Sequence, residues 1–104
     1  MPAHTAEALM RSRYSAFVMQ NEPYLLSTWQ ARTRPDAVPF EPGTKWLGLK
    51  IVAARELDAD HAEVEFIARF RVGGASAQRI HERSRFIREA GRWLYVDGVQ
   101  PGSK

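Results

Sequence analysis

The chain reads AEVEFIARFRV from residue 62 to residue 72, and this stretch decides the fold class. Apolar and charged side chains alternate along it, which is the period of a β-strand with one face on a core. The following pair Gly73-Gly74 predicts a turn. We expect an inward set and an outward set of side chains on this strand: Val64, Phe66, Ala68 and Phe70 face the core, and Glu63, Glu65, Arg69 and Arg71 face away.

Three more segments have the pattern of strands: residues 46–54, 79–89 and 92–99. The connections between successive strands are too short for the crossovers that parallel strands need. The sequence therefore predicts a four-stranded antiparallel sheet over residues 46–100. Ahead of it, Thr5 can cap a helix that runs to about Gln20, and Pro23 restarts a short second helix. We expect helices over about residues 5–30, a loop over residues 31–45, and one α+β domain over residues 1–104.

The first predicted helix carries apolar side chains at helical spacing on one face, and Arg13 is predicted at the border of that face. An antiparallel sheet twists, so we expect a strongly curved sheet that wraps around this helix and encloses a cavity.

Composition excludes several kinds of chemistry. The 104 residues are 44% hydrophobic and 26% charged, as in ordinary globular domains, and none is cysteine. Disulfides, thiolate zinc sites and cysteine nucleophiles are therefore excluded, and the three histidines share no ligand spacing. We expect no metal and no cofactor. No apolar run approaches the roughly 18–20 residues of a membrane span, so the sequence predicts a cytoplasmic protein without a membrane partner.

Strand 79–89 carries the candidate catalytic residue. A period of two places Ile80, Glu82 and Phe86 on one face, and Glu82 is then on the core side. Burial raises the pKa of a carboxyl group unless a cation or a hydrogen-bond donor compensates, and a raised pKa suits a general base. Arg13 is the cation that we expect to pair with Glu82. Alternatively, Glu82 and Arg13 form a structural ion pair, or a bulge reverses the parity and turns His81 inward.

Other side chains are candidates for the wall of a ligand pocket. They are Tyr14, Trp29, Trp46, Phe66, Trp93 and Asp97, with Arg13. Aromatic residues at these spacings also suit an ordinary core. If Asp97 lies on the face of Glu82, two acids converge and acid/base chemistry is favoured. Both faces of residues 92–99 are apolar, so the sequence leaves this question open.

The outward faces of the predicted strands carry five arginines, and the net charge of the chain is +3. Nucleic-acid binding is disfavoured, because glutamates share these faces and no aromatic pair stands among the arginines to stack on bases. Ile67 and Ile87 interrupt the polar pattern, so a homodimer through this face is an alternative use of it.

Several segments resemble the YchJ-like family of uncharacterised bacterial proteins, over nearly the whole chain and in the same order. They are TAEALMRSRYSAFV at 5–18, WLGL at 46–49, VEF at 64–66, HERSRF at 81–86 and RWLYVDG at 92–98. The resemblance implies a fold similar to nuclear transport factor two and the cystatin-like superfamily. Many such relatives carry a cysteine-rich SEC-C segment that resembles a zinc module, but without cysteine no zinc is carried over to this chain.

The family implies no activity, and fold alone does not give one. From these residues we expect a small-ligand-binding or adaptor module with a pocket between helix and sheet, whose partner is an unknown small molecule or protein. The first alternative is an acid/base enzyme of the isomerase, dehydratase or hydrolase type that uses Glu82. The second is weak nucleic-acid binding through the arginine-rich face.

Overall fold

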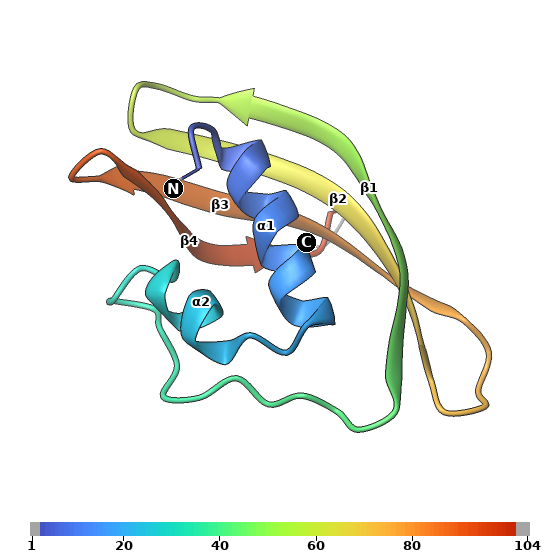
Figure 1. The fold of residues 1–104 in the computed structure, drawn as a ribbon. Coiled ribbons are helices and arrows are strands. Elements are labelled where there is room, and N and C mark those ends of the chain that lie inside the picture. Colours follow the sequence, from blue (N-terminus) through green and yellow to red (C-terminus); the bar gives the residue numbers. More distant parts are fainter. Residues whose placement is uncertain (1–2, 102–104) are drawn as a thin grey trace.

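Two helices precede four strands in a computed structural model that describes residues 3–101. They are α1 (Ala6–Val18), α2 (Glu22–Ser27), β1 (Thr44–Glu56), β2 (His61–Val72), β3 (Gln78–Glu89) and β4 (Arg92–Val99). The strands form one antiparallel sheet in the order β1-β2-β3-β4, and α1 lies across one face of it (Figure 1). This confirms the predicted α+β class, and the predicted strands agree with the observed ones within two residues at each end. Residues 1–2 and 102–104 of the predicted domain lie outside the described residues.

Local capping explains where the helices begin. The Thr5 hydroxyl accepts a hydrogen bond from the Ala8 amide at 3.0 Å, which satisfies one of the free donors at the start of α1. The Asn21 side chain accepts from the Tyr24 amide at 3.3 Å at the start of α2, and Pro23 lies in the first turn, where no amide donor is needed.

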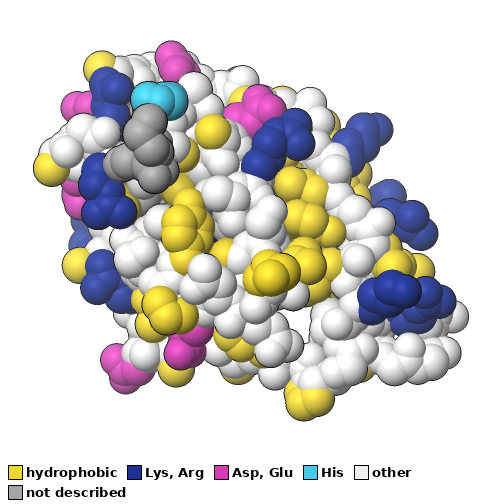
Figure 2. Space-filling view, viewed as in Figure 1, with side chains coloured by type: hydrophobic (Ala, Val, Ile, Leu, Met, Phe, Trp, Pro, Cys, Tyr) yellow, Lys and Arg dark blue, Asp and Glu magenta, His cyan; other side chains and the backbone are white. Residues whose placement is uncertain are grey.

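The main core lies between α1 and the sheet. Leu9 and Met10 of α1 pack there on the alternating residues of β2, and the predicted inward set of β2 is confirmed for Val64, Phe66 and Ala68. A second cluster, around Leu25 and Val38, packs the end of α1 against α2 and the loop that follows. On the face in Figure 2, hydrophobic side chains gather between α1 and β1.

The segment after α2 covers the outer edge of β4. The Tyr95 amide donates to the Thr28 carbonyl and the Gln30 amide donates to the Tyr95 carbonyl, each at 2.8 Å. The Thr33 hydroxyl donates to the Val96 carbonyl at 2.7 Å. These bonds satisfy an edge that would otherwise expose free donors and acceptors, and they hold Trp29 beside Tyr95.

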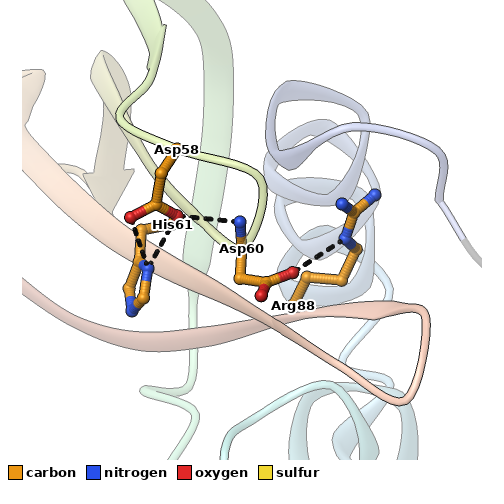
Figure 3. A network of polar contacts seen from close by, with 4 residues as sticks. All are labelled: Asp58, Asp60, His61 and Arg88. Atoms are coloured by element: carbon orange, nitrogen blue, oxygen red, sulfur yellow. Dashed lines mark hydrogen bonds and ion pairs between the residues drawn. The ribbon is translucent and has the colours of Figure 1, made fainter.

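The β1–β2 turn is held by polar contacts among four residues (Figure 3). The Asp58 carboxylate contacts Nδ1 of His61 at 2.9 Å and accepts from the Asp60 amide at 2.8 Å. Asp60 in turn contacts Arg88 of β3 at 3.4 Å. His61, the first residue of β2, is exposed, so this contact faces solvent.

Candidate functional site

A cavity of about 170 Å³ lies between α1 and the inner face of the sheet. Six of the predicted site residues lie in its wall: Arg13, Tyr14, Trp29, Trp46, Phe66 and Glu82. The rest of the wall is formed by Met10, Phe17, Ala68, Ile80, Ser84 and Tyr95. Trp93 and Asp97 are not part of the wall. The cavity is therefore mainly apolar and aromatic, with a small number of polar groups.

The side chains of β3 alternate between the two faces of the sheet as the sequence predicts, so Glu82 faces the cavity. Ser84 and Phe86, on the same face, are 0% and 1% exposed. The Ser84 hydroxyl donates to Oε2 of Glu82 at 2.6 Å, and the Tyr95 hydroxyl approaches the same oxygen at 3.4 Å. The Glu82 side chain is half-buried and lies over Gly98 of β4, where a Cβ atom would overlap with the carboxylate.

The sequence predicts Arg13 at the border of the apolar face of α1. This prediction is wrong, because the residue is buried, with an exposure of 2%. Its Nη1 donates to the Leu25 carbonyl at 2.8 Å and to the Thr28 hydroxyl at 2.6 Å. The guanidinium carbon lies 5.0 Å from the ring centroid of Trp29 and 4.5 Å from that of Tyr95. Hydrogen bonds and two aromatic faces replace water around the charge, which is why a cation can be buried here.

The expected ion pair between Arg13 and Glu82 does not form: among residues 3–101, no salt bridge within 4.0 Å involves either side chain. The alternative prediction, a structural ion pair between the same two residues, is therefore wrong as well. Tyr95 contacts both instead, with its ring beside Arg13 and its hydroxyl near Glu82.

Burial changes the titration of two groups in the cavity wall. Desolvation lowers the pKa of Arg13 to about 10, partly offset by electrostatic interactions that include Glu82. Desolvation, followed by the charge of Glu82, raises the pKa of the Tyr95 phenol well above its usual value of 10. Tyr95 is therefore a neutral hydrogen-bond donor at physiological pH.

Asp97 lies away from the cavity because β4 contains a bulge. In the β3–β4 register, Phe86 is opposite Tyr95 but Arg85 is opposite Asp97, so Val96 is the extra residue. An extra residue reverses the parity of the residues after it. Asp97 therefore faces outward and binds Arg85 through two hydrogen bonds of 2.6 and 2.5 Å, while Gly98 faces Glu82. The two acids do not converge.

Trp93 and His81 also lie outside the cavity. Trp93 is 6% exposed and belongs to the main core, with Arg88 over its ring at 5.5 Å. His81 points to the outer face of the sheet, where its Nε2 lies 2.6 Å from the Glu65 carboxylate. Within the described part of the chain, no three histidine, aspartate or glutamate side chains gather into a group that could hold a metal ion.

Two contributors to the site, Ser84 and Gly98, are not among the residues predicted from the sequence. Ser84 had a usable signal, because it shares the period-two face of Glu82. Gly98 had none, because its placement depends on the bulge at Val96. A glycine within a strand can mark a close approach, but it does not name the approaching side chain.

A helix laid across a four-stranded antiparallel meander, with a cavity between them, is the arrangement of an NTF2-like domain. Residues 5–98 match the family model described as "YchJ, middle NTF2-like domain", and the chain belongs to this family. Among its relatives is a UPF0225 protein from Polaromonas naphthalenivorans, 65% identical over 96% of this chain and 73% of the relative. Another, from Bordetella pertussis, is 54% identical over 94% of this chain and 74% of the relative.

A solved structure has the same fold. It is the solution structure of a SEC-C motif containing protein from Rhodopseudomonas palustris, which is 34% identical to this chain. The TM-score is 0.85, over 96% of this chain and 81% of that one. In the described residues, neither helix has the length and apolar character needed to cross a membrane.

Proposed function

We propose that the domain binds a small molecule in the cavity between α1 and the sheet. The observation that carries this proposal is the cavity itself, about 170 Å³ between α1 and the sheet and lined mainly by apolar and aromatic side chains. Protein interiors are close-packed, so a hollow beneath a sheet forgoes packing that larger side chains would supply. An apolar cavity of about 150 Å³ is large enough for benzene, so the size suits a ligand with one ring.

The lining also has the composition of a binding site. Ligand pockets are mostly apolar, with a few polar groups that fix orientation. Trp46 packs against Tyr14 at 5.7 Å and against Phe17 at 6.2 Å between ring centroids, which provides aromatic surface at one side. Glu82 and Ser84 supply the polar groups.

Tryptophan fluorescence can test the proposal, because Trp29 and Trp46 line the cavity. We expect benzyl alcohol and toluene, both neutral aromatic molecules of one ring, to change the emission saturably. Ala68→Leu fills the space from β2, where Ala68 is 2% exposed, and should abolish the change. Ala75→Leu adds the same atoms in the exposed β2–β3 turn and should leave it intact.

Circular dichroism and thermal unfolding of both variants show whether each still folds. If Ala68→Leu does not fold, Ile80→Trp serves instead, because Ile80 is 37% exposed in the cavity wall. Saturable binding that survives in a folded cavity-filling variant, or no binding by either molecule, would contradict the proposal.

Acid/base catalysis is the second candidate function, and the position of Glu82 favours it. Only Oε2 of Glu82 accepts hydrogen bonds from described residues, so Oε1 is available to a bound molecule. Arg13 and Tyr14 would then act as positioning groups. A bound compound that the native protein converts and Glu82→Gln does not would support catalysis, whereas recovery of every bound compound unchanged would leave binding as the function.

A further inference from the structure

We infer that the cavity selects a small organic cation: a protonated amine on an apolar body of about one ring. This inference rests on the proposed function and names the chemistry of the ligand. The observation behind it is an unpaired carboxylate, that of Glu82, among aromatic side chains.

No cationic group lies within 4.0 Å of the Glu82 carboxylate among the described residues, and Arg13 acts on it only from a longer distance. Its two hydrogen bonds, from Ser84 and Tyr95, come from neutral hydroxyl groups and both reach Oε2. Half-burial removes part of the water that would otherwise solvate the charge. An ammonium group at Oε1 would supply the missing charge and a charge-assisted hydrogen bond.

Arg13 does not supply that charge, although it belongs to the same wall. Its Nη1 is bound to a carbonyl and a hydroxyl group, and its guanidinium carbon lies 4.5 Å from the ring centroid of Tyr95. At 2% exposure it offers little surface to a ligand, whereas Glu82 is partly accessible. The accessible charge in the wall is therefore negative.

The rest of the wall favours a cation over an anion. Rings of Tyr14, Phe17 and Trp46 form one side of the cavity, and aromatic faces attract cations. An anionic ligand would place its charge near Glu82, and a like charge in a poorly solvated site is repelled. A neutral ligand would fit the apolar surface but would leave the carboxylate unpaired.

Gly98 is a positioning residue for this site. The Glu82 side chain lies over Gly98, where a Cβ atom would overlap with the carboxylate and its Cγ. Only glycine leaves this space free, so Gly98 lets Glu82 lie flat against β4 beside the Tyr95 hydroxyl. Gly98→Ala should displace the carboxylate while keeping its charge.

Three molecules of similar shape test the inference: benzylamine, benzyl alcohol and benzoate, titrated at pH 7 against the tryptophan fluorescence of the native chain. We expect the dissociation constant of benzylamine to be about tenfold or more below that of benzyl alcohol, as for one charge-assisted hydrogen bond. Benzoate should bind more weakly than either. Glu82→Gln should reduce the preference for the amine to about twofold or less.

Two further variants separate charge from position. Glu56→Gln removes one negative charge at the exposed end of β1 and should keep the full preference. Gly98→Ala keeps the charge but should weaken benzylamine binding more than benzyl alcohol binding. A preference that persists in Glu82→Gln, or tighter binding of benzoate, would overturn the inference.

The inference and the proposed function fail in different ways. If benzyl alcohol binds and benzylamine binds no better, the cavity binds small molecules but does not select cations, and only the inference fails. If none of the three molecules binds, both fail.

Discussion

At the scale of single residues, the site depends on the contact between Glu82 and Gly98. Replacing a strand glycine with alanine usually stabilises a protein, because glycine loses more chain entropy on folding. At Gly98 the added Cβ would overlap with the Glu82 carboxylate, so the side chain must move. The stability effect should therefore have the opposite sign.

We predict that Gly98→Ala destabilises the domain by about 1–3 kcal/mol, the usual range for added atoms in a packed place. Gly74→Ala is the matched control, because nothing lies within 4 Å of a Cβ at that position. It should gain about 0.4–1 kcal/mol. Urea unfolding of the two variants measures both. Equal stability of the two would show that Glu82 swings aside without cost.

Asp97 gives a pH prediction. The Arg85 guanidinium holds the pKa of Asp97 below its usual value of 3.8. The folded state then binds fewer protons than the unfolded state near that pH. The contribution to stability is present above about pH 4 and is lost as the pH falls through the folded pKa.

Asp97→Asn should therefore lower stability by about 0.2–1 kcal/mol at pH 7, as for an exposed ion pair, and should flatten the loss of stability below about pH 4. Urea unfolding from neutral to strongly acidic pH checks this. An unchanged slope in the acid range would show that other carboxylates control it.

Whether the position of a site residue could be predicted from the sequence depends on how regular the element around it is. The inward position of Glu82 follows from the period of β3, because that strand has no bulge before Arg85. The outward position of Asp97 could not be predicted, because alternation assumes a regular ladder and Val96 is an extra residue in an apolar strand. The spacing of the apolar residues places Arg13 at the border of the helix face, and its full burial could not be predicted, because an arginine is seldom buried without a carboxylate.

At the scale of elements, the strand pattern is strong and predicts the sheet, its order and its direction. The helix starts also follow from the sequence, since Thr5 caps the first helix and Pro23 lies in the first turn of the second. One part of the contact between α1 and α2 does not follow: the Arg13 side chain, which reaches the Leu25 carbonyl and the Thr28 hydroxyl. A long polar side chain that spans two helices leaves no periodic signal.

We predict that Arg13→Ala destabilises the domain by about 2–4 kcal/mol, because it removes two hydrogen bonds, two aromatic contacts and the volume of the side chain. Arg13→Lys should lose less, since it keeps the charge and most of the volume but not the planar group. Thermal and urea unfolding measure the difference. If Arg13→Ala costs no more than an ordinary surface substitution, about 0.5 kcal/mol, the guanidinium does not hold α1 against α2.

The sheet itself contains an unfavourable pair. Arg69 of β2 and Arg79 of β3 are directly opposite one another and both are exposed. Like charges in this position destabilise a sheet, so Arg79→Glu should stabilise it by about 0.2–1 kcal/mol. The gain should shrink in about 1 M salt, which screens exposed charges. A gain that is independent of salt would point to a cause other than charge.

At the scale of the whole molecule, the charges on the outer face of the sheet are unevenly distributed. Towards β4, Arg85 binds Asp97 and Arg83 is opposite Glu65, so acids offset these arginines. At the other end, Arg69 is opposite Arg79 and Arg71 is opposite Lys45. Lys and Arg side chains are visible along the side of Figure 2 where β1 lies.

This distribution predicts how the chain behaves towards a polyanion. Two double variants test this: one combines Arg69→Glu with Arg79→Glu, and the other combines Arg83→Glu with Arg85→Glu. Both change the net charge equally, so net charge alone would reduce retention on a heparin column equally. We expect the first to elute at clearly lower salt than the second, because it removes cations that have no acidic neighbour across the strands. Elution of both at the same salt concentration would show that net charge, and not this end of the sheet, governs the interaction.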